Sequence, residues 1–306
     1  MKWKEINLES WLHFCLILEQ TGGIYTHRPM WSFRGHADNN WTLRPALTRK
    51  LLQHTWINSE IAKTIEQQLF AEFSTGFHAY SESARLVYAH YDRMRWMSIM
   101  QHFGCPTRLL DWSDSAYVAA YFACEALPEA DGAIYCLADN VFLSEMRKRK
   151  KHYKNDDEED LLWSTGKDPE VWHMTTNFQN QRCLSQHGTF TFCTSPFEDH
   201  DEFISYVLRD VPESHKYHLK LVVPNSLKLD FLSHLNTMGI NAATLFPGPE
   251  GFGRSFNAIT DMIVATRKIT EDLDLGTDVD DSMFSGGKHT RGARQAENGE
   301  NEDPST

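Results

Sequence analysis

Residues Gly188–Ser195 have the sequence GTFTFCTS, and the later segment His218–Pro224 has the sequence HLKLVVP. Both segments are rich in β-branched residues and show a side-chain period of two. Because successive side chains of a strand point to opposite faces of a sheet, these patterns predict two strands. The segment Gly132–Asp139, GAIYCLAD, is apolar almost throughout and predicts a third, buried strand.

Helical patterns come before these strands. Within residues 59–80, apolar side chains recur at intervals of four: Ile61, Ile65, Leu69, Phe73 and Phe77. A helical period also runs through residues 83–104, and Gly104 is its expected stop. Residues 111–127 are apolar nearly all round, which predicts a core helix capped by Ser113 or Asp114.

Three more helices are expected nearer the ends of the chain. Residues 1–21 have apolar side chains at helical spacing before Gly22, and interrupting glutamates argue against a signal peptide. Residues 227–238 predict a helix that Gly239 stops, and a glycine-rich loop then leads to a last helix. Helices therefore come first, and strands with one or two helices between them follow. This order predicts an α+β fold, with a helical N-terminal part packed on a mixed, mainly antiparallel sheet.

Length and composition favour a globular protein with an ample core. The chain has 306 residues, of which 41% are hydrophobic. We expect a single α+β domain over residues 1–270, with a charged insertion around 146–170. Residues 271–306 are acidic and poor in aromatics, so they are predicted to be a disordered tail. The net charge of −12 argues against a protein that binds duplex DNA by neutralising many phosphates, but it allows a small basic cleft.

Several classes of protein are disfavoured by the sequence. No window approaches the roughly 20 apolar residues of a membrane span, so we expect a cytoplasmic protein without membrane contact. The six cysteines are scattered with no CxxC pair, which predicts reduced thiols and no metal site. The HExxH, GxSxG and Walker A motifs, and a GxGxxG after a strand, are all missing from the sequence.

An arginine-rich segment, Trp31–Arg49, has the sequence WSFRGHADNNWTLRPALTR. Arg34 follows a strand-like run and precedes Gly35, which lets the backbone approach a ligand closely. A guanidinium in that position is suited to a phosphate or carboxylate, because its planar fork donates two hydrogen bonds at once. The structural alternative is that Arg34 pairs with a local carboxylate such as Asp38.

A second polar segment, Met100–Ser115, combines His102, Thr107, Arg108 and Trp112 around a proline. As a binding site, it would use His102 on a ribose hydroxyl or phosphate, and Arg108 to order the loop. As a structural element, it would be a helix–turn–helix corner in which Arg108 bonds to Asp111 and Trp112 forms a lid. Sequence alone leaves both interpretations open.

Two more segments have polar side chains that periodicity does not explain. Gln186 immediately precedes the GTFTFCTS strand, where it can line a cleft or bond its own turn. Glu250 lies in a Pro/Gly-rich loop at the start of the last helix. Its carboxylate can simply complement the helix dipole, or it can act as a catalytic acid, base or electrostatic stabiliser.

Together these segments resemble the FRG domain, a family named after its Phe/Tyr-Arg-Gly motif. Phe33-Arg34-Gly35, followed by the WTLRPALTR of Trp41–Arg49, resembles the family's opening. QHFGCPTRLLDWS (Gln101–Ser113) is similar to its central signature and is the most specific match. SQHGTF (Ser185–Phe190) and LFPGPEG (Leu245–Gly251) resemble its later elements, so the resemblance covers residues 31–262.

The resemblance implies a relative of the ADP-ribosyltransferases, with NAD as substrate, in a bacterial toxin or phage-defence setting. It also implies an ADP-ribosyltransferase-like core. In that chemistry Arg34 would bind the diphosphate, and Glu250 would lie near the ribose 2′-hydroxyl as the catalytic carboxylate. Trp112, Phe190 or Phe192 would stack on nicotinamide, as aromatic side chains can. The remaining nucleotide-binding residues would be Gly35, His102, Thr107, Arg108 and Gln186.

The sequence does not identify the acceptor of the ADP-ribosyl group. By family analogy it would be a nucleic-acid base in single-stranded DNA or RNA, and an antitoxin or defence-system protein would be a partner. Protein acceptors and water, which would make the protein an NAD glycohydrolase, remain open. A competing interpretation is a non-catalytic module that binds nucleotides or nucleic acid, in which Glu250 would be dispensable.

Overall fold

A computed structural model of the protein describes residues 3–20, 31–77, 79, 93–149, 170–174 and 184–272. The chain divides into two compact units, Met1–Met262 and Ile263–Thr306, with the boundary inside helix α13 (Pro249–Asp272). Most of the predicted tail (271–306) and of the predicted charged insertion (146–170) lies outside the described residues, namely 273–306 and 150–169. The start of the predicted insertion, residues 146–149, belongs to helix α7 (Asp139–Arg149). All of the following concerns the first unit.

A mixed sheet forms the centre of this unit. In the described part of the chain it has seven strands, in the order β1-β7-β4-β2-β3-β6-β5. Their bounds are β1 (Lys4–Asn7), β7 (His218–Val223), β4 (Gly132–Ala138), β2 (Trp31–His36), β3 (Leu109–Ser113), β6 (Gly188–Cys193) and β5 (Val171–Met174). The β1–β7 pair is parallel and all the other pairs are antiparallel. The predicted α+β class and the mainly antiparallel sheet are therefore confirmed.

The sheet is nearly divided in the middle. Strands β2 and β4 pair over all six residues of β2, and β3 pairs with β6 over all five of its own. Between β2 and β3, however, Phe33 opposite Ser113 is the one registered pair. We call β1-β7-β4-β2 and β3-β6-β5 the two half-sheets. From Ser113 back toward Leu109, β3 has no registered pair with β2, and the two strands are separated by an opening.

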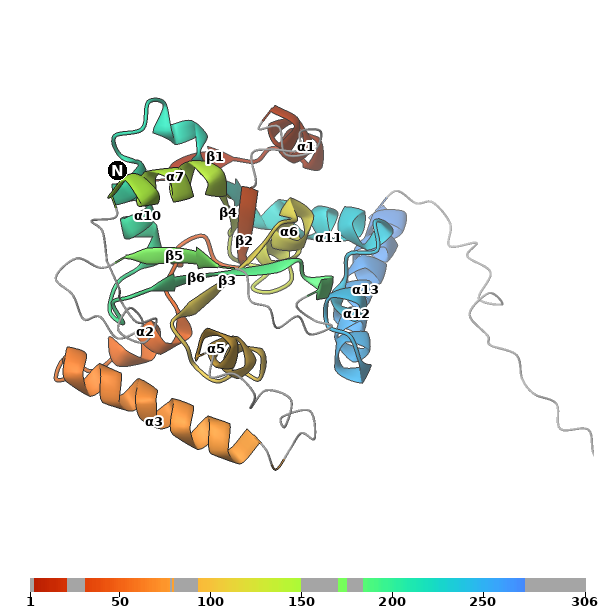
Figure 1. The fold of residues 1–306 in the computed structure, drawn as a ribbon. Helices are drawn as coiled ribbons and strands as arrows, with labels where there is room; N and C mark the ends of the chain where they lie inside the picture. The colour runs from red at the N-terminus through yellow and green to blue at the C-terminus, as the bar shows by residue number, and fades with distance from the viewer. Residues whose placement is uncertain are drawn as a thin grey trace, which may run out of the picture. The chain divides into compact units, whose positions relative to one another are not determined.

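Helices cover both faces of the sheet (Figure 1). Helix α6 (Ala116–Cys124) packs on β2, with α1 (Trp11–Gln20) and α11 (Lys228–Thr237) beside it in the same hydrophobic cluster. Helix α5 (Arg93–His102) covers β3 and β6 through Met94 and Met97, and α3 (Ser59–Phe77) packs on α5. The opposite face is covered by α7 (Asp139–Arg149) and α10 (His200–Leu208), whose Phe142 and Ile204 join Leu110 and Trp112.

Short helices complete the described part of this unit. They are α2 (Ala46–Leu51), α12 (Ala242–Leu245) and two 3-10 turns, η1 (Ser214–Lys216) and η2 (Asn225–Leu227). The predicted stops after α5 and α11 are confirmed, because Gly104 and Gly239 have positive φ angles of 81° and 77°. That backbone region is open to glycine at little cost, which explains why both helices end there.

Four local predictions were wrong. The N-terminal segment is not one helix, because β1 (Lys4–Asn7) precedes α1. Residues 109–113 form strand β3, and the following helix is capped by Ser115, whose side chain accepts the Val118 N–H. The glycine-rich loop is already helical, because α13 begins at Pro249. Proline suits this first position because its missing N–H would have no partner there.

Candidate functional site

A pocket of about 230 Å³ lies where the two half-sheets separate. Its walls come from β2, β3, β6, α5 and α6, and Gln186 closes it at the entrance of β6. Of the ten residue positions predicted as nucleotide-binding or catalytic from sequence, the structure brings six to this pocket: Arg34, Gly35, His102, Trp112, Gln186 and Phe190. These residues are far apart in sequence, so their convergence makes the pocket the candidate site.

Two of the three guanidinium nitrogens of Arg34 make hydrogen bonds that hold the side chain at the pocket. Its Nε donates to Nε2 of His36 at 3.0 Å, and its Nη1 donates to the Asp111 carbonyl oxygen at 2.5 Å. Nη1 is also 3.9 Å from the Asp111 carboxylate, whereas Nη2 has no partner among the described residues. The side chain is 18% exposed. The sheet thus presents a fixed cation with unused donors toward the pocket.

The Arg34 contacts also explain why the sheet opens. Its Nη1 bonds to a carbonyl of β3 at the level where further β2–β3 pairing would be expected. Burial lowers the pKa of the Arg34 guanidinium, and the charge of Asp111 acts in the opposite direction. Arginine nevertheless stays protonated in proteins, so the site keeps its positive charge. The structural alternative paired Arg34 with Asp38, but the carboxylate beside its guanidinium is that of Asp111.

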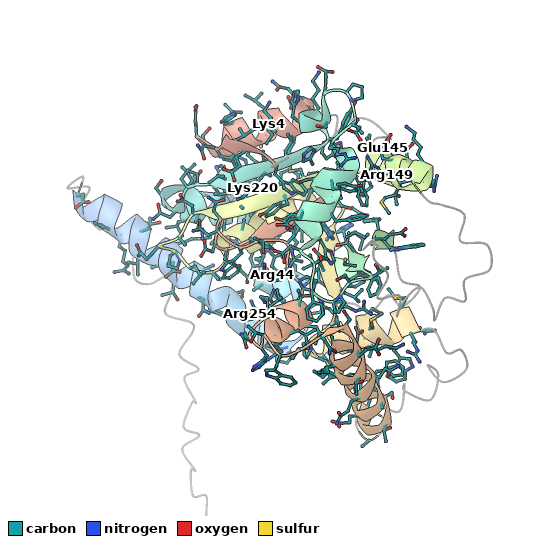
Figure 2. The ribbon with its side chains drawn as sticks, turned by 90° about the vertical axis from the view of Figure 1, so that its left-hand side faces the viewer. Lys4, Arg44, Glu145, Arg149, Lys220 and Arg254 are labelled. Carbon is teal, nitrogen blue, oxygen red and sulfur yellow. The ribbon has the colours of Figure 1, made fainter. Side chains whose placement is uncertain are left out.

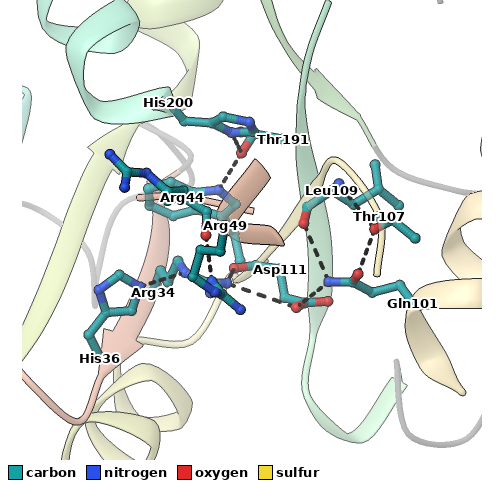
Figure 3. A network of polar contacts seen from close by, with 11 residues as sticks. Arg34, His36, Arg44, Arg49, Gln101, Thr107, Leu109, Asp111, Thr191 and His200 are labelled. Carbon is teal, nitrogen blue, oxygen red and sulfur yellow. Dashed lines mark hydrogen bonds and ion pairs between the residues drawn. The ribbon is translucent and has the colours of Figure 1, made fainter. Parts of the chain in front are cut away.

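His36 supports Arg34 in a neutral form (Figure 3). Burial, and then the charge of Arg34, lower the pKa of His36 to about 3. Since Nε2 accepts from Arg34, the proton of the neutral ring must lie on Nδ1, which is 3.2 Å from the carbonyl oxygen of Trp41. This tautomer lets one imidazole accept from the arginine and donate to the backbone.

Asp111 is the carboxylate that lines the pocket (Figure 3). Its side chain is 56% exposed, and its Oδ2 accepts from Nε2 of Gln101 at 2.9 Å. Gln101 in turn accepts at Oε1 from the Thr107 hydroxyl at 2.6 Å. The structural interpretation of this segment bonded Asp111 to Arg108, but in the structure Arg108 pairs with Glu66. The pocket therefore combines a fixed cation and a fixed carboxylate on either side of the opening between the half-sheets.

Gly35 is required by helix packing. A Cβ at this position would lie 2.0 Å from the carbonyl oxygen of Ala119 and 2.7 Å from the backbone nitrogen of Ala123, both in α6. Real atoms do not approach so closely, so any side chain here would push α6 away from β2. The glycine was expected to allow close approach of a ligand, but in the structure it allows close approach of a helix.

Three phenylalanines give the pocket its apolar surface: Phe33, Phe122 and Phe190. Trp112 contributes less than predicted. It alternates with Asp111 along β3, clusters with Leu110 and is 2% exposed, so its indole lies on the opposite face of the sheet. There its Nε1 donates to the Thr191 hydroxyl. The predicted stacking of the Trp112 ring on a ligand is therefore not supported by its position.

Arg108 does not line the pocket. It is 2% exposed, and its Nε and Nη2 bind the two carboxylate oxygens of Glu66 at 2.9 and 2.8 Å. Nη1 donates to the carbonyl oxygens of Cys193 and Thr194, and the guanidinium lies 4.5 Å from the Phe192 ring centroid. These contacts join α3 to the end of β6. They favour a structural role for Arg108 over a direct contact with a nucleotide, with Glu66 and not Asp111 as its partner.

Glu250 is also outside the group of residues that line the pocket. It lies exposed in the first turn of α13, where a carboxylate complements the helix dipole. The neighbouring segment does approach the pocket, because Gln186 donates to the Leu245 carbonyl oxygen and Phe246 contacts the Phe122 ring. The structure therefore brings the backbone of the LFPGPEG segment close to the site, but not its carboxylate.

The other two arginines of the opening segment have different environments. Arg44 (Figure 2) is bound by Asp199 at the start of α10, with one Nη2–Oδ2 distance of 2.7 Å. Arg49 is exposed and donates to the Arg44 carbonyl oxygen, and its charge contributes to lowering the pKa of Arg34 and His36. Arg44 is thus structural, whereas Arg49 adds positive charge beside the pocket.

Sequence reasoning missed Asp111, Gln101, Phe33 and Phe122 as candidate residues of the site. Recognising strand β3 would have identified Asp111 as a residue of the pocket. The side chains of Leu109, Asp111 and Ser113 point to the same face of the sheet, which α5 and α6 cover. No comparable signal marks Phe122, which is one of several apolar residues in α6.

Comparison with known proteins bears on this site directly. Residues 29–132 match the family model described as the FRG domain. The chain contains an FRG domain. The matched residues include the Phe-Arg-Gly motif of β2 and the QHFGCPTRLLDWS segment, and thus both charged side chains of the pocket. The later SQHGTF and LFPGPEG segments lie outside the match.

Searches of curated proteins and of solved structures gave no match to the chain. The chemistry of the site is therefore inferred from the geometry of its pocket. In the described residues, no helix combines the length and the apolar character needed to cross a bilayer.

Proposed function

We propose that the FRG-domain pocket binds NAD and cleaves its nicotinamide–ribose bond, as an ADP-ribosyltransferase. The observation that carries this proposal is the pairing of Arg34 and Asp111 across the opening between the half-sheets. The Nη2 group of Arg34 offers donors to a diphosphate oxygen, and charge-assisted bonds of this kind are among the stronger ones in proteins. Phe33 and Phe190 supply an apolar surface for a planar ring.

The size of the pocket favours partial enclosure of the ligand. Small-molecule sites typically have volumes of roughly 300–1,000 Å³, and this one has about 230 Å³. A space somewhat below that range suits the nicotinamide riboside end of the dinucleotide. The adenosine end would then lie outside, on the side where Arg49 adds positive charge.

In the proposed reaction, the bond between ribose C1′ and the nicotinamide nitrogen breaks. The bonding electrons leave with nicotinamide, and positive charge develops on the ribose, as in glycoside hydrolysis. A nitrogen or oxygen of the acceptor then bonds to C1′ and releases one proton. Asp111 would stabilise the developing positive charge, because a fixed carboxylate acts most strongly where charge appears in the transition state. In this proposal Asp111 takes the role that the family resemblance implied for Glu250.

The acceptor proposed here is a base of single-stranded DNA or RNA. The positive charge of Arg34 and Arg49 beside the pocket supports an anionic polymer at this place, although the chain as a whole carries a net charge of −12. Water or a protein side chain as acceptor would give a different product from the same bond cleavage, so product analysis separates the three.

The test is nicotinamide release from NAD by purified wild-type protein and by Arg34→Ala, with and without single-stranded DNA or RNA. Losing a charge-assisted bond of roughly 1.5–3 kcal/mol should weaken NAD binding about 10- to 100-fold. Arg209→Ala is the matched control, because Arg209 is an exposed arginine that does not line the pocket. A wild-type protein that binds NAD without releasing nicotinamide would make the domain a binding module and refute the proposal.

Two carboxylate variants separate the candidate roles. Asp111→Asn keeps the side-chain shape and removes its charge, and we expect kcat to fall roughly 100- to 1,000-fold. Glu250→Gln should leave kcat close to that of the wild type. The opposite result, with turnover lost in Glu250→Gln and kept in Asp111→Asn, would restore Glu250 as the catalytic carboxylate and overturn the assignment of Asp111.

A further inference from the structure

We propose that Thr107 and Gln101 are positioning residues, which fix the Asp111 carboxylate inside the pocket through a hydrogen-bond chain of defined direction. This inference rests on the proposed function for its kinetic part. Its structural part concerns hydrogen bonds and can be measured without turnover. Thr107 was expected to contact a nucleotide, but it is 2% exposed and does not line the pocket.

The direction of the chain starts at the backbone. The N–H of Leu109 donates to Oγ1 of Thr107 at 3.2 Å, so this contact uses an acceptor site of the hydroxyl. The hydroxyl has a single proton, and Oε1 of Gln101 lies 2.6 Å away to accept it. The Thr107 hydroxyl therefore accepts a hydrogen bond from the backbone and donates one to Gln101.

The orientation of the Gln101 amide follows from the same contacts. Its Nε2 group is 2.9 Å from Oδ2 of Asp111 and 3.4 Å from the carbonyl oxygen of Leu109. An ionised carboxylate and a carbonyl can only accept hydrogen bonds, so the NH₂ group must face them. A rotation of the amide by half a turn would place Oε1 against two acceptors and the NH₂ group against the Thr107 proton. Thr107 and Asp111 thus enforce the same amide orientation from opposite sides.

The result is a carboxylate held at one oxygen and available at the other. Oδ2 of Asp111 accepts from Gln101 and lies 3.9 Å from Nη1 of Arg34. Oδ1 has no hydrogen-bond partner among the described residues, and the side chain is 56% exposed. A ligand can therefore meet a free oxygen of a carboxylate whose other oxygen is fixed. Side chains that hold a reacting group in this way govern how well it is aligned with its substrate.

Thr107 offers a cleaner test than Gln101. Gln101 itself lines the pocket, so its variants can change ligand binding directly. Thr107 is behind it, and a change at Thr107 reaches the pocket through the Gln101 amide. Thr107→Val keeps the shape of the side chain and removes the hydroxyl, whereas Thr107→Ser keeps the hydroxyl and serves as the matched control. Thermal unfolding of both variants establishes that each is folded.

The kinetic experiment measures nicotinamide release in a double-mutant cycle of Thr107→Val and Asp111→Asn. We expect Thr107→Val to lower kcat about 10-fold, because a loosened Gln101 amide would align the Asp111 carboxylate less well with the substrate, with little change in KM for NAD. In the Asp111→Asn background the same substitution should have almost no further effect, because the two residues act as a unit. An unchanged kcat in Thr107→Val, or equal losses in both backgrounds, would overturn the proposal.

A second measurement does not depend on turnover. The side-chain NH₂ protons of Gln101, followed by NMR, should exchange slowly with solvent in the wild type and in Thr107→Ser, and faster in Thr107→Val. If the wild type releases no nicotinamide, the proposed function fails, and these exchange rates decide the positioning role alone. Equal exchange in the wild type and Thr107→Val would refute it.

Discussion

Replacing Arg108 by methionine tests whether the most polar part of the central FRG signature is structural. Arg108 binds both oxygens of Glu66 and two carbonyls at the end of β6, with both side chains nearly buried. Removing one partner of a buried ion pair typically costs about 3–5 kcal/mol, because the other charge is left without compensation. We therefore expect the free energy of unfolding of Arg108→Met to fall by about that amount.

The matched control is the double variant Arg108→Met/Glu66→Gln. It removes the stranded charge, so part of the lost stability should return, although the two carbonyl contacts stay broken. Urea denaturation of the wild type, both single variants and the double variant gives the free energies, and equal m-values show that the unfolded states are comparable.

The competing prediction makes Arg108 a ligand-binding residue. In that case Arg108→Met would weaken nucleotide binding while changing the free energy of unfolding by less than about 1 kcal/mol, as is usual for substitutions away from the core. That result would refute the structural assignment. A folded but destabilised variant with unchanged NAD affinity would support it.

Two further predictions follow from packing and burial. Gly35→Ala should lower the free energy of unfolding by at least about 1–3 kcal/mol, because its Cβ would meet the α6 backbone. The control Gly253→Ala in α13, whose Cβ would meet nothing within 4 Å, should be neutral or stabilising, and equal effects of the two would contradict the packing argument. Burial lowers the pKa of His200 to about 3, so below its usual pKa of about 6.5 the unfolded chain gains a proton that the folded protein does not. His200 should thus lower the free energy of unfolding by about 1.4 kcal/mol per pH unit as pH falls from about 6.5 to 3. Urea denaturation across this range should show that the free energy of unfolding falls less steeply for His200→Asn than for the wild type. Parallel pH profiles would show that His200 is not the buried neutral group inferred here.

Sequence predicted secondary structure most accurately where a local pattern of side chains marks the element. The strands β4, β6 and β7 are marked by apolar runs or alternation, and all three are present. Strand β3 was missed because LLDWS is five residues long, and a short apolar run next to Asp and Ser is equally typical of a helix start. Missing β3 also hid Asp111, since its exposure on the pocket face depends on strand alternation.

The partners of charged residues were harder to predict. The structural interpretation bonded Arg108 to Asp111, which is three residues away, whereas its partner Glu66 is 42 residues away. Glu66 lies on a helix whose pattern shows nothing unusual at that position. Arg34 was likewise given the nearby Asp38, but it reaches Asp111 at a separation of 77 residues. Sequence singled out Arg34 and Arg108, but it could not show which carboxylates the fold would bring to them.

The near-separation of the half-sheets has a mechanical consequence. A continuous sheet passes load between neighbouring strands through a ladder of backbone hydrogen bonds, but here the ladder has one registered pair, Phe33 with Ser113. Next to that pair, the side-chain bond from Arg34 to the β3 backbone is a second link between the two strands. A ligand bound in the opening would contact both half-sheets and would link them. A ligand present at 100 times its Kd would add about 2.7 kcal/mol to the free energy of unfolding. Amide exchange in β2 and β3 would then slow together when it binds.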